Sequence, residues 1–258
     1  MIRLGGILFD LDGVIFQGNS LIPGSKEILY ALRSAGTPYR YITNTTRMTK
    51  NNLIKMLGNM GLVVDQNEIF AAPHAAIEYC KLMGYNKILL IVPDKEMQDD
   101  FSAFQLVDNN PDAVVVGDMG ELFTFKLMNK LFRIIINGAE LVAMHKNRYW
   151  VAADGLALDL GAFISALEYA SNKSAAVMGK PNANLFNLAV HSWNISKDFI
   201  YVVGDDLEGD IRGAQNAGMK SILVKTGKFR YENLENLKIV PDYIINSIAD
   251  LPGLIQFN

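Results

Sequence analysis

Short apolar runs alternate with helix-like patterns along the first 72 residues of the chain. One run, at 6–9, precedes Asp10, and another, at 39–43, ends in Thr43. Short runs bounded by glycine or polar residues indicate buried strands. Apolar residues that recur every three or four positions, at 28–35 and 53–60, indicate helices after each run. The order strand, helix, strand, helix predicts a parallel sheet.

The middle of the chain, 73–175, carries apolar runs and helical periodicities of its own. We expect these elements to form a separate, smaller α/β domain. The predicted elements are helices at 73–83, 121–132 and 160–170, strands at 87–92 and 113–116, and a hairpin of 141–144 with 149–152.

Regular alternation resumes near Ala176. Pro181 is placed to start a helix, the apolar run 199–203 predicts a strand, and a further helix ends at Gly218. We therefore predict an α/β fold with a Rossmann-like, doubly wound parallel sheet as the core. In this prediction 1–72 and 176–258 form the core, 73–175 forms an inserted domain, and the last strands lie at 221–224 and 243–245.

Composition excludes several classes of protein. The 258 residues are 50% hydrophobic, which allows a large core, and the lone cysteine, Cys80, fits a reducing compartment. A net charge of -3 and a pI near 5.7 argue against nucleic-acid binding. No apolar stretch has the roughly 18 residues that a membrane span needs, so we expect a cytoplasmic protein.

Polar side chains follow the predicted core strands. The carboxyl ends of parallel strands lie along one edge of the sheet, and open α/β sheets bind ligands at that edge. We therefore expect these side chains to gather there. They are Asp10, Asp12, Thr43, Asn44, Lys180, Asp205 and Asp210.

These residue types favour phosphoryl transfer. Carboxylates such as Asp10 and Asp205 are the oxygen ligands that Mg²⁺ prefers, and the chain has no histidine and cysteine cluster suited to zinc. Lys180 adds a compact positive charge that suits a phosphate dianion. Asp10 could attack phosphorus to give an aspartyl phosphate, while Asp12 acts first as an acid and then as a base.

The polar segments resemble the four motifs of the haloacid dehalogenase superfamily of phosphatases, and they occur in the same order. The resemblance implies that Asp10 is the nucleophile and that Asp12 is the general acid and base. It also implies that Mg²⁺ is held by the Asp10 carboxylate, the Asp12 backbone carbonyl and Asp205. The matching segments are Asp10-Leu-Asp12-Gly-Val, Thr43-Asn44, Lys180 and Gly204-Asp205-Asp206-Leu-Glu-Gly-Asp210.

The same resemblance assigns the other polar residues. It implies that Thr43 and Asn44 bind phosphate and that Lys180 steadies the nucleophile and the phosphoryl group. Asp210 receives a lesser, supporting role.

Motif spacing locates the inserted domain. Thr43 follows Asp10 by 33 residues, whereas Lys180 follows Asn44 by 136, which is far more than one strand and helix require. This resembles the C2-capped branch, which includes the p-nitrophenyl phosphatases and the NagD-type nucleotide phosphatases. Thr-Asn-Thr-Thr, Gly-Lys-Pro and Val-Lys-Thr-Gly-Lys at 224–228 look most like the phospholysine phosphohistidine inorganic pyrophosphate phosphatase group. Homodimers formed through the cap are what the resemblance suggests.

Asp12 departs from some members of that group, which have serine at this position. An aspartate favours hydrolysis of an ordinary small phosphomonoester, and phosphoramidate or pyrophosphate hydrolysis is an alternative. A domain that takes phosphate on Asp10 only for signalling is another alternative, although the large insertion argues for substrate selection. A dinucleotide-binding domain is disfavoured, because no Gly-x-Gly-x-x-Gly follows the first strand.

The inserted domain is expected to choose the substrate. His145 begins a polar and aromatic segment, 145–150, and we expect it to contact the leaving group together with Arg148. A solvated hairpin tip is the alternative for this segment. Arg47, just after the second motif, could reach a substrate anion or only the surface.

Overall fold

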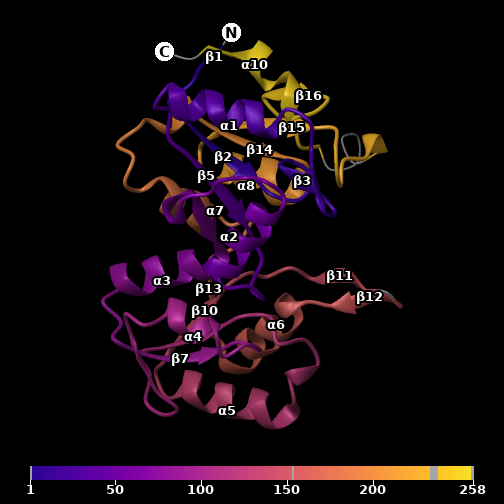
Figure 1. Ribbon diagram of the computed structural model, residues 1–258. Helices are drawn as coiled ribbons and strands as arrows, with labels where there is room; N and C mark the ends of the chain where they lie inside the picture. The colour runs from indigo at the N-terminus through magenta and orange to yellow at the C-terminus, as the bar shows by residue number, and fades with distance from the viewer. Residues whose placement is uncertain (1, 153, 233–237, 257–258) are drawn as a thin grey trace. The chain divides into compact units, whose positions relative to one another are not determined.

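The computed structural model describes residues 2–152, 154–232 and 238–256, and the chain forms two compact units (Figure 1). The first, called the core below, comprises Met1–Thr43, Asn51–Phe70 and Lys180–Asn258. The second, called the cap, comprises Asn44–Lys50 and Ala71–Gly179.

A six-stranded parallel sheet forms the centre of the core, with the strand order β16-β15-β14-β2-β5-β6. β2 lies between β14 and β5, and all five of its residues are buried. The carboxyl ends of these strands therefore lie along one edge. The strands are β2 (Gly6–Asp10), β5 (Tyr39–Thr43), β6 (Ile69–Ala71), β14 (Ile200–Gly204), β15 (Lys220–Val224) and β16 (Tyr243–Ile245).

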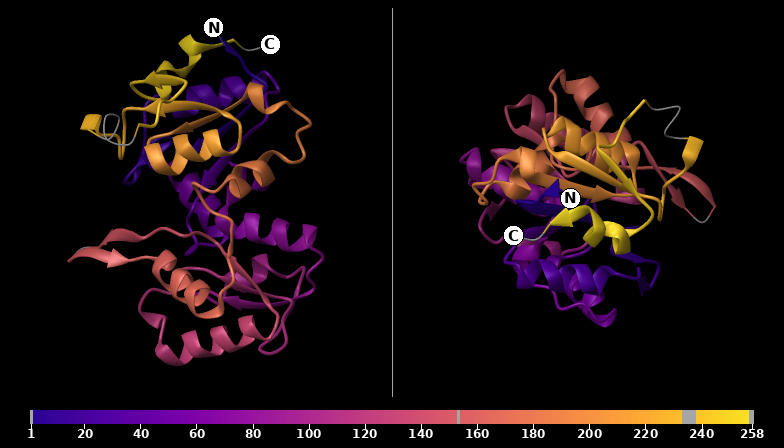
Figure 2. Two further views of the ribbon diagram at one scale, coloured as in Figure 1. Left: turned by 180° about the vertical axis from the view of Figure 1, so that it is seen from behind. Right: turned by 90° about the horizontal axis from the view of Figure 1, so that it is seen from above.

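Helices cover both faces of the core sheet. Because successive strand residues point to opposite faces, Phe9 packs with Leu32 of α1, whereas Leu223 packs with Ile211 on the other face. Figures 1 and 2 show α1 and α8 on opposite sides of the sheet. This is the doubly wound arrangement predicted from the sequence. The helices are α1 (Ser25–Ser34), α2 (Lys50–Asn59), α7 (Ala183–Val190), the π-helix η4 (Leu207–Arg212), α8 (Gly213–Asn216) and α10 (Leu251–Leu254).

The cap contains its own five-stranded parallel sheet, with the order β13-β10-β9-β7-β8. Leu131 of α5 and Ile164 of α6 pack on Val114 and Val116 of this sheet, and α3 covers the opposite face (Figure 1). The elements are α3 (Ala72–Leu82), β7 (Lys87–Ile91), α4 (Met97–Asp100), β8 (Gln105–Leu106), β9 (Ala113–Val116), α5 (Phe125–Ile136), β10 (Glu140–Ala143), α6 (Leu160–Ser171) and β13 (Ala176–Val177).

The predicted hairpin of 141–144 with 149–152 is wrong. β10 pairs in parallel with β9 and β13 inside the cap sheet, and β11 (Tyr149–Ala152) pairs with β12 (Gly155–Leu158) instead. Leu141, Val142 and Ala143 are all buried. A run buried on both faces belongs in the interior of a parallel sheet, and a hairpin strand would have left alternate residues in solvent.

Two predicted helices have different limits in the structure. The helix expected at 121–132 begins at Phe125, after the Thr124 hydroxyl has accepted the N–H of Leu127, and it continues to Ile136. Pro181 does not start α7, because Asn182 is the N-cap and its side chain accepts the N–H of Asn184.

No helix within the described residues is long and apolar enough to cross a membrane.

Several short elements were not predicted. The short elements are β1 (Ile2–Arg3), β3 (Phe16–Gln17), β4 (Ser20–Leu21), β17 (Ile255–Gln256), η1 (Gln66–Glu68), η2 (Gly120–Leu122), η3 (Lys197–Phe199) and η5 (Ile248–Asp250).

Candidate active site

Asp10 is the last residue of the central strand β2, and the residue is 6% exposed. The apolar side chains of the strand are held between neighbouring strands and helices, so the strand end is fixed. Asp10 Oδ1 accepts the N–H of Leu11 at 2.8 Å and lies 2.8 Å from Lys180 Nζ. The strand therefore presents a carboxylate whose position is set by two hydrogen bonds.

Lys180 joins two of the buried carboxylates. Its ammonium lies 2.8 Å from Asp10 Oδ1 and 2.7 Å from Asp210 Oδ1. Burial alone would lower the pKa of Lys180, but the two carboxylates raise it above its ordinary value. Lys180 is therefore a permanently charged group.

Asp205, directly after β14, completes an acidic cluster with Asp10 and Asp210. One carboxylate oxygen from each residue lies within 4.8 Å of the others, and all three residues are buried. Asp205 Oδ2 accepts the N–H of Lys228 at 2.6 Å, whereas its buried Oδ1 has no hydrogen-bond partner within the described residues. A buried oxygen of this kind is costly unless a ligand satisfies it.

The electrostatics of this cluster favour a bound cation. Burial and the neighbouring Asp10 charge raise the pKa of Asp205 to about 6. The same two causes raise the pKa of Asp210. Within the described residues, the ion pairs of the cluster join Lys180 to Asp10 and Asp210, so three carboxylates outnumber the one cation that pairs with them. Hard oxygen ligands, excess negative charge and one unsatisfied oxygen together suit a divalent metal ion.

Glycines let two loops approach the Asp205 carboxylate. Gly13 has a φ of 81° and Gly227 a φ of 60°, values that disfavour other residues. A Cβ built on either glycine would collide with Asp205 Oδ2. The backbone at Gly13 and Gly227 thus forms a cradle around the Asp205 carboxylate, and a side chain at either position would fill the space that the carboxylate occupies.

The other residues predicted for the core chemistry lie at the expected strand ends. Asp12 lies two residues beyond β2, its side chain is exposed, and its backbone forms a bridge with Phe16. Thr43 is the last residue of β5 and is half-buried. Asp210, to which the resemblance gives a supporting role, is fully buried in the acidic cluster.

Asn44 belongs to the cap, together with His145. The Asn44 amide donates to Asn147 Oδ1 at 3.4 Å. A Cβ built on Gly179 would meet both the Asn44 amide oxygen and the His145 Cβ. Asn44, Gly179 and the 145–147 segment are therefore packed together within the cap.

His145 does not lie at a solvated hairpin tip, because it is only 4% exposed. Its Nδ1 accepts the N–H of Asn147, and its Nε2 lies 3.7 Å from Asp159 Oδ1. Burial lowers the pKa of His145 despite the neighbouring Asp159, so the ring is neutral near pH 7. Arg148, by contrast, is exposed.

Arg47 is held at the surface of the cap. Its Nε and Nη2 both donate to Asp118 Oδ2, at 2.9 and 2.6 Å, and its guanidinium stacks over the Trp150 ring at 5.6 Å. The side chain is 50% exposed, so one side of this ordered cation faces solvent.

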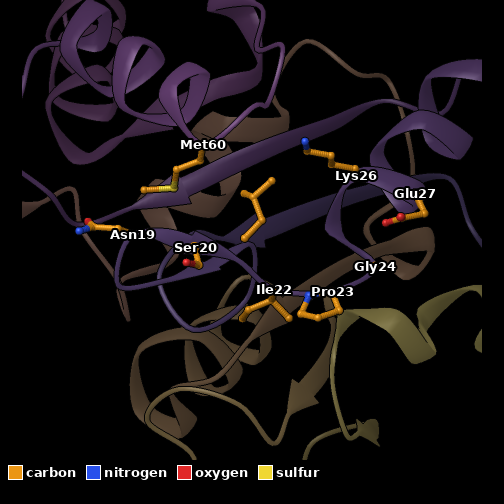
Figure 3. A pocket seen from close by; sticks show the side chains of 9 residues that line it. Asn19, Ser20, Ile22, Pro23, Gly24, Lys26, Glu27 and Met60 are labelled. Atoms are coloured by element: carbon orange, nitrogen blue, oxygen red, sulfur yellow. The ribbon is translucent and has the colours of Figure 1, made fainter.

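A hollow of about 450 Å³ lies elsewhere on the core, beside β4 and the start of α1 (Figure 3). Its described lining contains no residue predicted for the site. The lining comprises 19–24, Lys26, Glu27 and Met60.

Comparison with known proteins agrees with this geometry. Residues 7–106 match the family described as haloacid dehalogenase-like hydrolase, and 177–251 match the family described as HAD-hydrolase-like. The haloacid dehalogenase-like hydrolase domain-containing protein 2 of Bos taurus is 37% identical over 92% of this chain and 90% of its own. The chain belongs to the haloacid dehalogenase superfamily, in its NagD and p-nitrophenyl phosphatase-like branch. The resemblance predicted from the motifs is thereby confirmed.

This haloacid dehalogenase-like hydrolase has further relatives of similar length. The phospholysine phosphohistidine inorganic pyrophosphate phosphatase of Homo sapiens is 31% identical over 97% of this chain and 93% of its own. The crystal structure of 4-nitrophenylphosphatase from Thermotoga maritima has a TM-score of 0.87 and 26% identity, with 98% of each chain covered. NagD from E. coli, at 23% identity over all of both chains and a TM-score of 0.85, shows the same fold. The five-stranded inserted sheet is the C2-type cap of these structures.

Proposed function

We propose that this hydrolase is a Mg²⁺-dependent phosphatase that cleaves a small phosphomonoester through an aspartyl phosphate on Asp10. The observation that carries the proposal is the acidic cluster of Asp10, Asp205 and Asp210 around a charged lysine at the carboxyl edge of the sheet. The relatives named as phosphatases support a phosphorylated small molecule as the substrate class.

Asp10 is the nucleophile in this proposal. The hydrogen bond from the Leu11 N–H and the ion pair with Lys180 both use Oδ1 of Asp10, which leaves Oδ2 to attack phosphorus. Attack forms the new P–O bond as the bond from phosphorus to the leaving oxygen breaks. Lys180 holds Oδ1 and places a positive charge beside the phosphoryl oxygens, where negative charge develops.

Asp12 moves the proton in both halves of the reaction. It gives a proton to the departing alkoxide, and it then removes one from the water that attacks the aspartyl phosphate. Hydrolysis releases inorganic phosphate and restores the Asp10 carboxylate. Exposure suits this role, because the Asp12 side chain can exchange protons with solvent.

The metal site is proposed at Asp10, the Asp12 backbone carbonyl and Asp205. A bound Mg²⁺ would neutralise charge on the phosphoryl group and orient it for displacement. Asp210 pairs with Lys180 and thereby holds the ammonium beside Asp10. Thr43 and Asn44 are proposed to donate hydrogen bonds to the phosphate.

Hydrolysis of p-nitrophenyl phosphate tests the proposal. Turnover should require Mg²⁺, disappear in excess chelator and return when Mg²⁺ is restored. Undiminished turnover by protein shown to be metal-free would contradict it.

A second candidate is hydrolysis of a phosphoramidate or of pyrophosphate. The human relative named for phospholysine, phosphohistidine and pyrophosphate supports it, because that relative covers nearly the whole chain. Rates on phospholysine, pyrophosphate and a panel of phosphorylated metabolites, measured with the same protein, would decide between the two candidates. Exclusive turnover of P–N or P–O–P bonds would favour the second.

A further inference from the structure

The loop after β15 packs against the proposed metal site, although no motif assigns it a role. This loop, 225–228, reads Lys-Thr-Gly-Lys and follows the carboxyl end of β15, two strands from β2 in the core sheet. We propose that it positions the metal-binding oxygens, with Thr226 as a positioning residue; this inference rests on the proposed metal-dependent function.

The loop fixes the Asp205 carboxylate. The backbone N–H of Lys228 donates to Asp205 Oδ2 at 2.6 Å, and the Gly227 backbone lies against the same oxygen. A carboxylate held through Oδ2 cannot rotate freely, so the position of its other oxygen, the buried Oδ1, is also set. Asp205 Oδ1 is the oxygen that has no hydrogen-bond partner within the described residues.

The loop also fixes the turn that follows the nucleophile. The Thr226 hydroxyl donates to the Gly13 carbonyl, while the Gly13 N–H donates to Phe16 O at 2.7 Å. In a trans peptide the C=O and N–H point in opposite directions, so the bond to Phe16 sets the direction of the Asp12 carbonyl. With Gly13 held on both sides, the carbonyl proposed as a metal ligand has a defined orientation.

The loop is itself rigid. The N–H of Lys225 donates to the carbonyls of Ile245 and Asn246, at 3.1 and 3.2 Å, and the Phe229 N–H donates to Thr226 O at 3.2 Å. These bonds attach the loop to the end of β16 and close it as a turn. A metal site needs such support. Removing a group that hydrogen-bonds to a metal ligand typically lowers metal affinity by about 10 to 100-fold.

Thr226→Val tests the role of the hydroxyl. Valine has nearly the same shape and lacks only the hydrogen-bond donor to Gly13. We expect the dissociation constant for Mn²⁺, measured calorimetrically on the full chain, to rise by about tenfold or more. Thr226→Ser, which keeps the hydroxyl, should restore affinity to near the wild-type value.

Lys228→Ala is the matched control. It keeps the N–H that holds Asp205 and removes a side-chain cation paired with Asp206 at 3.3 Å. Loss of a nearby positive charge should leave Mn²⁺ binding as tight as in the wild type, or tighter. Gly227→Ala adds a second test that needs no change at Thr226, because its Cβ would displace the Asp205 carboxylate. Urea unfolding of each metal-free variant shows that the variant is folded.

The outcomes separate this inference from the proposed function. Unchanged Mn²⁺ affinity in folded Thr226→Val and Gly227→Ala would overturn the positioning role while the metal site stood. Weaker binding in Lys228→Ala alone would also overturn it, because the side-chain charge would then be the cause. Failure of the wild-type protein to bind Mn²⁺ would overturn the metal site and this inference together.

Discussion

The core and the cap both bury aspartates, but they balance the buried charge differently. In the core, Lys180 pairs with Asp10 and Asp210, and the third carboxylate, Asp205, has one oxygen with no hydrogen-bond partner within the described residues. In the cap, Asp118 accepts two hydrogen bonds from a single arginine and one from a backbone N–H. The core cluster is thus able to bind a cation, whereas the cap aspartate is neutralised by its arginine partner.

The cap histidine follows the same pattern. His145 is neutral and buried, and Asp159 beside it accepts the N–H of Leu160 at the start of α6. Through Gly179 and Asn147, the segment around His145 packs next to Asn44. Buried polar groups in the cap therefore hold the shape of the segment. In the core, the excess of negative charge indicates a candidate functional site.

The largest expected effect is loss of the nucleophile. Asp10→Asn should lower kcat by roughly 10⁴ or more, because an amide replaces the carboxylate that is proposed to attack phosphorus. Circular dichroism should show an unchanged fold. A variant that kept a tenth of the wild-type kcat would remove Asp10 from this role.

Asp12→Ala should produce a loss that depends on the leaving group. General acid catalysis is typically worth about 10² to 10⁴, and an alkoxide needs the proton far more than nitrophenolate does. The ratio of kcat/KM for an alkyl phosphate to that for p-nitrophenyl phosphate should therefore fall. Equal losses on both substrates would assign Asp12 to metal placement or folding.

Changes in the cap should be smaller and selective. His145→Ala combined with Arg148→Ala should lower kcat/KM for the best metabolite by about 1 to 3 kcal/mol, because the exposed Arg148 loses a polar contact and the segment loses the buried ring that holds its shape. Turnover of p-nitrophenyl phosphate, which offers the cap little to bind, should change much less. Arg148→Ala alone is the useful control, because Arg148 is exposed and its loss should spare stability. Equal falls on both substrates, or none, would show that this segment does not select the substrate.

The pH dependence of metal binding should show the charge imbalance of the core. The pKa of Asp205 is raised to about 6, above the ordinary 3.8, so protons compete with the metal below pH 6. Mn²⁺ affinity should fall by about tenfold between pH 7 and pH 5, one unit below that pKa. A constant affinity across this range would contradict the raised pKa.

The same shift gives the sign of its effect on folding. Because the folded pKa is raised, the metal-free folded state binds more protons than the unfolded chain between pH 3.8 and about 6. The contribution of Asp205 to stability should therefore grow as pH falls through 6. In urea titrations Asp205→Asn should remove this pH-dependent component, and an unchanged pH profile would contradict the sign.

Much of the fold and the core chemistry could be predicted from the sequence. Asp10 and Thr43 end strands at their expected positions, because short runs that end in polar residues are typical of strands in a parallel sheet. The Asp205 segment followed from the same reasoning.

The missed features depend on tertiary packing. Nothing in the sequence showed that Asp210 would be fully buried within hydrogen-bond distance of Lys180. The π-helical turn that carries Asp210 is too short for a repeating spacing of apolar residues to reveal it. The cradle around Asp205 uses the N–H of Lys228, and a backbone donor leaves no side-chain signature. The signal that could have indicated it is the glycine in Lys-Thr-Gly-Lys directly after a strand end. The burial of His145 was hidden because β10 joined the cap sheet in place of the predicted hairpin.

Trapping the covalent intermediate tests the central claim most directly. Protein quenched with acid during turnover of a phosphomonoester, then reduced with borohydride, should carry homoserine in place of aspartate at one position, which peptide mass spectrometry can locate. We predict that this position is Asp10 and that Asp10→Asn shows no such conversion. Conversion at another residue, or its absence from wild-type protein quenched during rapid turnover while a known aspartyl-phosphate enzyme is labelled in parallel, would contradict the account.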